Sequence, residues 1–161
     1  MTSLSSLDRV AIAKAEPAVQ RAAHWFWWIA GLSVINTAIL AFGGDIHFVV
    51  GLGVTQILDV AFRQIIAVAL VLDVFVVGFF VLMGVFAARG HLWAFVIGAI
   101  CYLVDGAIFA YFGDWLPVAF HAYVLFCLFK GWNHLRESLR AAREQPEAPP
   151  VPDITVPPPL A

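Results

Sequence analysis

The stretch Asn36-Thr-Ala-Ile-Leu-Ala-Phe-Gly-Gly-Asp45 recurs later in the chain as Asp105-Gly-Ala-Ile-Phe-Ala-Tyr-Phe-Gly-Asp114. Five of the ten positions are identical, and three more differ by a close replacement. Each copy ends an apolar stretch long enough to enter a bilayer, and each places a polar residue, Asn36 or Asp105, at the same point. The repeat predicts an all-α polytopic membrane protein built from two similar helical hairpins, related by an axis along the membrane normal.

The composition supports a membrane protein. Hydrophobic residues make up 62% of the chain and charged residues 12%, whereas soluble domains have roughly 45–50% and 25%. A membrane-spanning helix needs about 20 mostly apolar residues. Four blocks meet or nearly meet that length: Trp25–Phe42, Ile65–Ala88, Leu92–Phe112 and Leu116–Trp132. The sequence therefore predicts four transmembrane helices within one domain, residues 25–132.

The segments outside this domain have different compositions. Residues 1–24 carry apolar side chains at helical spacing up to Pro17, which predicts a short amphipathic helix on the membrane surface. They lack the pattern of a cleaved signal peptide, so the first span is expected to be retained. Residues 133–145 continue the fourth helix as a cytoplasmic amphipathic extension. Residues 146–161 contain seven prolines and are predicted to be a disordered tail.

The basic residues predict the orientation. Eight of the nine Lys and Arg residues lie at one side of the predicted spans, and Arg63 alone lies at the other. Cytoplasmic loops carry the excess of Lys and Arg. We therefore expect a multi-pass protein of the inner (cytoplasmic) membrane, with both termini cytoplasmic and residues 43–64 external.

The external segment is longer in the first hairpin than in the second. Thr55, Asp59 and Arg63 share one helical face, and Asp59 and Arg63 have the i,i+4 spacing of an ion pair. Gly51 and Gly53 indicate a turn before this face. We predict an amphipathic segment that covers the helices like a lid.

Four polar residues lie within the apolar blocks: Asn36, Asp73, Asp105 and His121. At about 1.5 Å per helical residue, all four are expected roughly 6–12 Å below the outer surface. Ionisable residues at such depth are costly and mark functional sites by default. Two carboxylates at one level would not both stay ionised, so one is expected to share its proton with the other or with the asparagine.

Helical spacing predicts how these residues face. In the third span Ala94, Gly98, Cys101 and Asp105 fall on one stripe, and small residues let helices approach closely in lipid. This stripe is the predicted packing face. Cys101 and Cys127 form no Cys-x-x-Cys motif and are interpreted as small packing residues.

The predicted cluster has several chemical interpretations. Asp105 would be the central acid, Asp73 its paired carboxylate, His121 a proton or metal partner, and Asn36 a positioning group. Asp73, Asp105 and His121 are the candidate ligands of a divalent metal. Proton transfer, a small polar ligand or a lipid head group are the other options. A purely structural polar core that fixes helix register remains an alternative.

Three function classes stay open at this point. The first is a membrane protein that handles an ion, a proton or a small ligand. The second is an accessory or scaffolding subunit of a larger membrane complex, and the third is a membrane-embedded enzyme acting on a lipid. The sequence contains no nucleophile, metalloprotease or phosphate-binding motif that would decide whether the chain is an enzyme, and it leaves the cofactor unknown. The expected partners are the lipid bilayer and a homo-oligomer or larger complex; the basic residues form no nucleic-acid-binding stripe.

Overall fold

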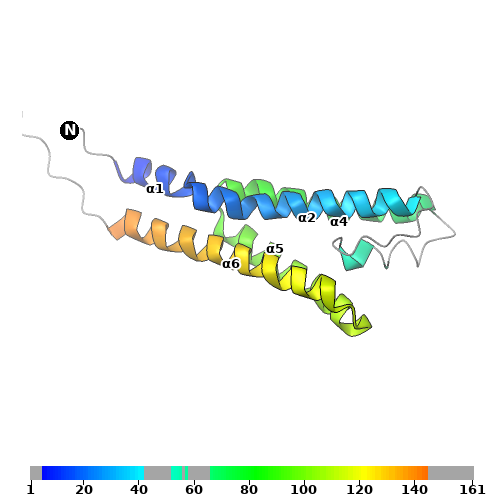
Figure 1. Cartoon of the computed structure of the whole chain (residues 1–161). Helices are drawn as coiled ribbons and strands as arrows, with labels where there is room; N and C mark the ends of the chain where they lie inside the picture. The colour runs from blue at the N-terminus through cyan, green and yellow to red at the C-terminus, as the bar shows by residue number, and fades with distance from the viewer. Residues whose placement is uncertain (1–4, 42–51, 56, 58–65, 145–161) are drawn as a thin grey trace, which may run out of the picture.

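The computed structural model describes residues 5–41, 52–55, 57 and 66–144 of the chain. These residues are helical apart from short connections and contain no strand. The helices, coloured along the chain in Figure 1, are α1 (Ser6–Lys14), α2 (Pro17–Ala41), α4 (Ile66–Ala88), α5 (Leu92–Phe112) and α6 (Trp115–Glu144).

Local sequence explains where several helices begin and end. Ser5 and Asp8 form a reciprocal capping box at the start of α1. Pro17 opens α2, a position where the missing N–H costs nothing. Gly90 and Gly113 have φ angles of 75° and 80°, and they form the tight turns that follow α4 and α5. Most other residues would be strained in this left-handed conformation.

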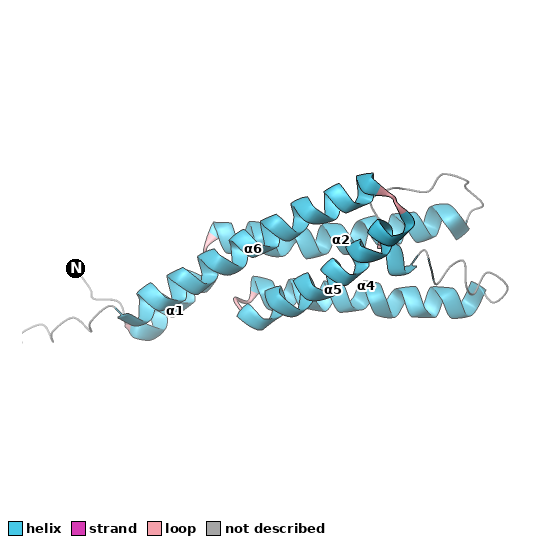
Figure 2. Cartoon of the chain, turned by 90° about the horizontal axis from the view of Figure 1, so that it is seen from below, coloured by secondary structure: helices cyan, strands magenta, loops and turns pink. Residues whose placement is uncertain are grey.

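The four long helices pack in a closed order. α2 lies against α4 and α6, and α5 lies against the same two helices on the other side (Figure 2). The pair α5–α6 leans away from the pair α2–α4 at the end opposite α1 (Figure 1). The short helical stretch at residues 53–55 lies between the two pairs at this open end. The start of α1 and the end of α6 lie together at the opposite end.

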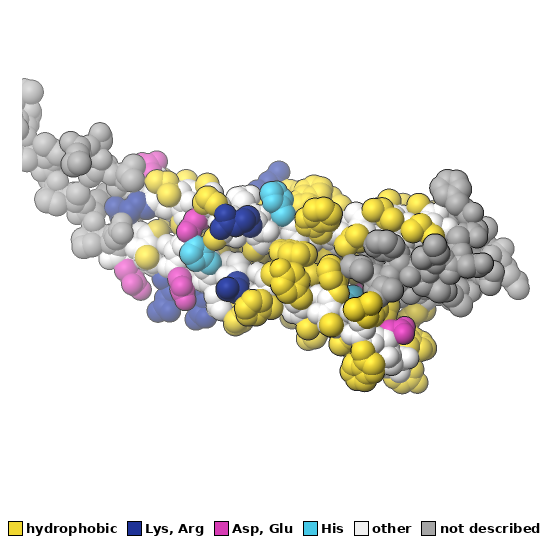
Figure 3. Space-filling model, in the orientation of Figure 1, with side chains coloured by type: hydrophobic (Ala, Val, Ile, Leu, Met, Phe, Trp, Pro, Cys, Tyr) yellow, Lys and Arg dark blue, Asp and Glu magenta, His cyan; other side chains and the backbone are white. Residues whose placement is uncertain are grey.

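Three helical segments are long and apolar enough to cross a membrane: Leu70–Ala88, Leu92–Phe112 and Trp115–Glu144. Many large apolar side chains along the helices are exposed, among them Val74, Phe75 and Val104. Charged side chains gather toward the end that holds α1, and apolar side chains cover much of the remaining visible surface (Figure 3). These features suggest a multi-pass membrane protein whose helices lie in a lipid bilayer.

Glycines bring the helices into close contact in the half nearer α1. The Phe26 ring of α2 is fully buried and fills the space beside two glycines. A Cβ added at Gly98 of α5 would lie 2.4 Å from that ring, and one at Gly84 of α4 would lie 3.1 Å from the Phe26 Cβ. In α6, a Cβ at Gly131 would lie 2.1 Å from the Cβ of Ala22. Small residues at helix crossings are the usual packing device in lipid.

Several sequence predictions of the helices agree with the structure. α5 has the predicted bounds of the third span, and α4 begins one residue after the predicted start of the second. α6 contains the fourth span and continues for about three turns, as expected. α2 differs, because it begins at Pro17, eight residues before the predicted first span.

The packing face of α5 was predicted wrongly at one position. Cys101 is exposed and does not belong to the packing face of α5; Tyr102, 1% exposed, occupies the buried position instead. The helix expected before Pro17 is α1, and its position on a membrane surface stays a prediction. It packs along the C-terminal part of α6, where Ala13 is buried and the Arg9 Nε donates to the Ala142 carbonyl at 3.4 Å.

Candidate functional site

A buried acid–base pair joins α5 to α6. The Nε2 atom of His121 lies 2.9 Å from the Oδ2 atom of Asp105. Both side chains are almost fully enclosed, with exposed fractions of 2% and 4%. The other ring nitrogen of His121, Nδ1, donates to the backbone carbonyl of Pro117 at 2.8 Å. This second contact fixes the orientation of the imidazole ring within the first turns of α6.

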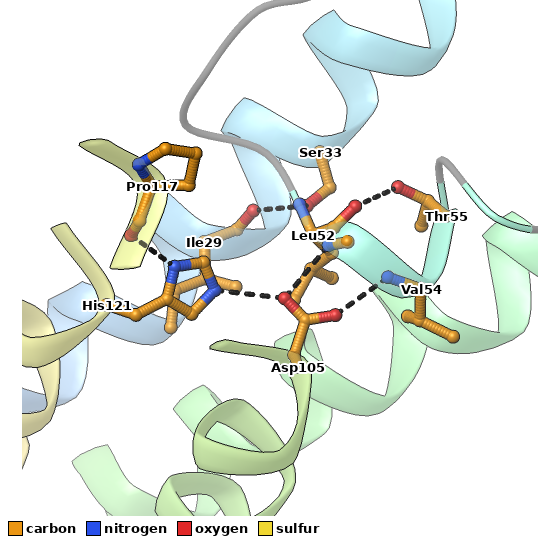
Figure 4. Close-up of polar contacts among 9 residues, drawn as sticks. Ile29, Ser33, Leu52, Val54, Thr55, Asp105, Pro117 and His121 are labelled. Carbon is orange, nitrogen blue, oxygen red and sulfur yellow. Dashed lines mark hydrogen bonds and ion pairs between the residues drawn. The ribbon is translucent and has the colours of Figure 1, made fainter. Parts of the chain in front are cut away.

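The same carboxylate binds the backbone of a distant segment. The N–H of Gly53 donates to Asp105 Oδ2 at 2.9 Å, and the N–H of Val54 donates to Oδ1 at 2.8 Å. The preceding N–H, of Leu52, donates to the hydroxyl of Ser33 on α2 at 3.2 Å. Figure 4 shows Asp105 at the centre of these contacts. Leu52 and Thr55 are fully buried, so residues 52–55, which we call the inserted segment, sit inside the protein.

Residues 53–55 form one helical turn, and the first N–H groups of a helix have no partner within it. A buried N–H group without a partner is costly, most of all in a bilayer. Ser33 and Asp105 satisfy three consecutive N–H groups of the segment. Ser33 itself donates to the Ile29 carbonyl of its own helix at 2.9 Å. Two side chains thus hold one turn of chain between α2 and α5.

Glycine and aromatic residues shape the pocket around the histidine. The ring of Tyr102 stacks on the His121 ring with centroids 4.2 Å apart, and the Phe109 ring lies at 5.3 Å. A Cβ at Gly106 would lie 3.0 Å from the His121 Cβ, so α5 and α6 meet closely at this level. A Cβ at Gly53 would lie 2.9 Å from the Phe109 ring. These contacts leave the pair in an apolar, enclosed environment.

The hydrogen bonds of the pair determine its proton count. Nδ1 of His121 faces a carbonyl oxygen, which only accepts, so Nδ1 carries a hydrogen. Nε2 faces a carboxylate oxygen, so one further proton lies between Nε2 and Oδ2. Two backbone N–H groups also donate to Asp105, so its two oxygen atoms accept from the inserted segment while Oδ2 shares a proton with His121.

The other predicted carboxylate belongs to a different helix contact. Asp73 of α4 is 3% exposed and accepts a hydrogen bond from the Thr37 hydroxyl of α2 at 3.0 Å. Asn36, the neighbour of Thr37, is buried at 6% exposure. A groove of about 580 Å³ runs beside this contact between α2 and α4. Its lining is Val34, Thr37, Ala38, Leu70, Asp73, Val74, Val77 and Gly78.

The four predicted site residues are all buried, and two of them, Asp105 and His121, form a direct hydrogen bond. Asp105 and His121 meet directly, whereas the sequence named Asp73 as the paired carboxylate of Asp105 and His121 as a proton or metal partner. Asp73 contacts α2, and the hydrogen bonds of Asp105 run to α6 and the inserted segment. Within the described residues no three His, Cys, Asp or Glu side chains cluster in a way that would hold a metal ion. The structure therefore gives no support to a metal bound by Asp73, Asp105 and His121.

Sequence reasoning missed the inserted segment. A lid covering the helices was expected, whereas residues 52–55 lie between them. Asp59 and Arg63, the predicted ion pair of that lid, are outside the described residues, as is the predicted Pro-rich tail. Two residues in the sequence could have indicated the inserted segment. Gly53 leaves room for the Phe109 ring, and Ser33 is the one serine within a predicted span. Neither residue indicates that its contact is made to backbone.

Comparison of the chain with protein-family models, curated proteins and solved structures gives no match.

Proposed function

We propose that this chain is a small multi-pass membrane protein that handles protons at the Asp105–His121 pair. The inserted segment is the element whose position depends on that proton. The observation that carries the proposal is the sharing of one carboxylate: Asp105 accepts from His121 and from the N–H groups of Gly53 and Val54 at once. A change in its charge therefore acts on helix packing and on the inserted segment together.

The chemistry of this coupling follows from the hydrogen bonds. Adding one proton to the pair converts the carboxylate to a neutral acid beside an imidazolium. The ion pair is then lost, and charge-assisted hydrogen bonds to the inserted segment become neutral ones, which are roughly half as strong. Tyr102, stacked on His121, is the further titratable side chain in contact with the pair. The segment is expected to loosen on protonation, which opens the space between the two helix pairs.

The proposed topology has four spans, with α2 as the first. α2 lies against α4 and α6, two helices long and apolar enough to cross a membrane. We place both termini in the cytoplasm and the protein in the inner membrane, because eight of the nine Lys and Arg residues lie at one side. The Asp105 end of the helices then faces the outer side. Four helices offer little room for a conduit, so a homo-oligomer is proposed as the working state.

Proton flux into liposomes tests the proposal. The protein is reconstituted with a pH-sensitive dye inside the vesicles, and a pH step is applied outside. The wild-type protein is expected to speed the pH change, and Asp105→Asn to abolish that increase. Asp114→Asn, which removes an exposed carboxylate just beyond α5, is the matched control and is expected to retain it. Equal rates for empty vesicles and wild type would overturn the proposal.

Hydrogen exchange provides the second readout. In Asp105→Asn, the amides of Gly53 and Val54 are expected to exchange at least about tenfold faster, because their charged acceptor is gone. Ser33→Ala should accelerate exchange at Leu52 but leave the ion pair and the proton flux intact. If Ser33→Ala abolished flux as completely as Asp105→Asn, the segment's position and not the proton pair would be the active feature.

The groove between α2 and α4 favours a second candidate function, that of a subunit in a larger membrane complex. Its outer rim carries exposed apolar side chains, Val34 and Val74, and Thr37 and Asp73 form its polar part. A groove of this kind fits an apolar helix of another chain that carries one hydrogen-bonding residue. A bifunctional thiol cross-linker at Val74→Cys, in a variant lacking Cys101 and Cys127, tests this. Cross-linking to a larger protein would support it, whereas an uncross-linked chain in native membranes would contradict it.

A further inference from the structure

A second hollow lies between α2 and α6, and it extends along both helices toward the end that holds α1. It has a volume of about 410 Å³. Small-molecule pockets span about 300–1,000 Å³, so this one is of ordinary size. The lining residues come from one face of each helix: Ala18, Arg21, Ala22 and Trp25 of α2, and Tyr123, Cys127, Lys130, Gly131 and His134 of α6.

The lining changes in character along the groove. Arg21, Lys130 and His134 lie on the turns of α2 and α6 nearer the charged end of the molecule. Trp25, Tyr123 and Cys127 lie on the turns deeper among the apolar helices, and the Trp25 and Tyr123 rings meet edge to face with centroids 5.5 Å apart. The groove is thus cationic at one end and aromatic or apolar at the other.

The floor of the groove is a close helix crossing. Gly131 of α6 meets Ala22 of α2, and a Cβ on Gly131 would lie only 2.1 Å from that of Ala22. Because both residues are small, the longer side chains on either side form walls around a hollow. The positively charged side chains flank this crossing in sequence on both helices, as Arg21 before Ala22 and Lys130 before Gly131.

The acidic residue Glu16 lies beside the groove and binds one of its lining residues, His134. His134 Nε2 contacts Glu16 Oε1 at 2.5 Å, and the Ser138 hydroxyl donates to Glu16 Oε2 at 2.8 Å. Glu16 thus fixes the position of the His134 ring. Arg21 and Lys130 remain as the permanent cations; the Lys130 Nζ also lies 5.1 Å from the centre of the exposed Phe126 ring.

We infer that this groove binds the phosphate of an anionic phospholipid from the inner leaflet. Arg21 and Lys130 would hold the phosphate, with His134 at its edge, and the first methylenes of an acyl chain would lie on Trp25 and Tyr123. The arrangement fits a lipid because the cationic end sits where the basic residues place the membrane surface and the apolar end extends into the bilayer. Basic pockets between helices on the cytoplasmic side suit anionic head groups.

Native mass spectrometry of the detergent-extracted protein tests the inference. The protein is titrated with phosphatidylglycerol, with phosphatidylcholine of the same acyl chains, and with inorganic phosphate. Wild type is expected to retain phosphatidylglycerol in preference to phosphatidylcholine. Each of Arg21→Gln and Lys130→Gln is expected to weaken the affinity for phosphatidylglycerol about fivefold. Lys130→Arg keeps the positive charge and should bind this lipid as wild type does.

The matched control is Arg140→Gln, which removes an exposed cation from the same helix outside the groove. Its affinity for phosphatidylglycerol should equal that of wild type. Equal retention of the two lipids, or equal loss in the control, would overturn the inference, because charge in general and not this groove would then hold the lipid. Retention of inorganic phosphate without lipid would also overturn it, since the site would then take a free anion.

Discussion

The two helix pairs each bury an aspartate, but they satisfy it in different ways. In α2–α4, Asp73 accepts from a neutral hydroxyl, Thr37, beside an open groove. In α5–α6, Asp105 accepts from an imidazole and from two backbone N–H groups inside a closed pocket. The comparison teaches that a polar residue at similar depth takes its role from the donors around it. Asp105 joins three parts of the chain, whereas the Thr37 bond of Asp73 joins two helices.

Replacing each aspartate by asparagine should give the largest difference in stability between the two helix pairs. Asn at position 73 still accepts from the Thr37 hydroxyl, so Asp73→Asn is expected to lower the free energy of unfolding by about 1 kcal/mol or less. Asp105→Asn removes one partner of a buried ion pair, and the expected loss is about 3–5 kcal/mol. Reversible unfolding in mixed detergent micelles, followed by circular dichroism, measures both values.

The contrast between the pairs fails if the two variants lose the same stability. A double variant with His121→Gln sharpens the test. Because the charge left by Asp105→Asn is then also removed, the double variant should recover part of the loss. The double variant of Asp73→Asn with His121→Gln should show no such recovery. It leaves Asp105 buried without its imidazole partner.

Glycine substitutions give the next largest difference. A Cβ at Gly106 meets the His121 side chain at 3.0–3.1 Å, while a Cβ at Gly78 of α4 meets nothing within 4 Å. Gly106→Ala is expected to cost about 1–3 kcal/mol through overpacking. Gly78→Ala is expected to be neutral or to stabilise by up to about 1 kcal/mol, because alanine favours helix. The melting temperatures of the two variants measure this difference. Equal shifts would mean that α5 and α6 pack less closely at Gly106 than the 3.0 Å approach indicates.

The smallest expected effect is a pH dependence at the end that holds α1. Hydrogen bonds from His134 and Ser138 lower the pKa of Glu16 below its ordinary value of 4.5. A carboxyl whose folded pKa is lowered stabilises the fold above its unfolded pKa and loses that contribution as the pH falls through the folded pKa. Glu16→Gln should therefore be less stable than wild type at neutral pH, with a difference that vanishes in acid.

Melting temperatures of wild type and Glu16→Gln between pH 7 and pH 3 check this prediction. The two curves are expected to converge below about pH 4.5, the unfolded value. The Glu16 side chain is about a third exposed, so solvent screens its charge and the expected difference in melting temperature is small. A gap that stays constant down to pH 3 would mean that the Glu16 contacts act through packing and not through charge.

Much of the helical architecture could be predicted from the sequence, because length and apolar content are local properties. The bounds of α5 follow directly from its apolar block, which ends at the glycine turn Gly113. Facing directions are harder, since side chains toward lipid and toward the core are both apolar. Cys101 and Tyr102 show this: spacing placed the smaller residue inside, and the structure buries the larger one beside His121.

The site was predictable only in part, for a different reason. Buried carboxylate and imidazole are conspicuous in an apolar block, so Asp105 and His121 could be named from residue type and depth. The inserted segment contributes its backbone N–H groups, which every residue but proline has. Sequence therefore carries no mark of that contact. Asp73 was paired with Asp105 from depth alone, and depth does not show a donor such as the Thr37 hydroxyl, which the structure places on Asp73.

The short connection between α5 and α6 has a consequence for how the protein is made. Asp105 and His121 are 16 positions apart, and only Gly113 and Asp114 separate their helices. An aspartate in a helix entering the bilayer alone costs about 2.5–3.5 kcal/mol on insertion scales. Its neutralising partner leaves the ribosome within a few seconds at ordinary synthesis rates of about 5–20 residues per second. We therefore expect α5 and α6 to enter the membrane as one unit, in which His121 offsets the cost of burying Asp105.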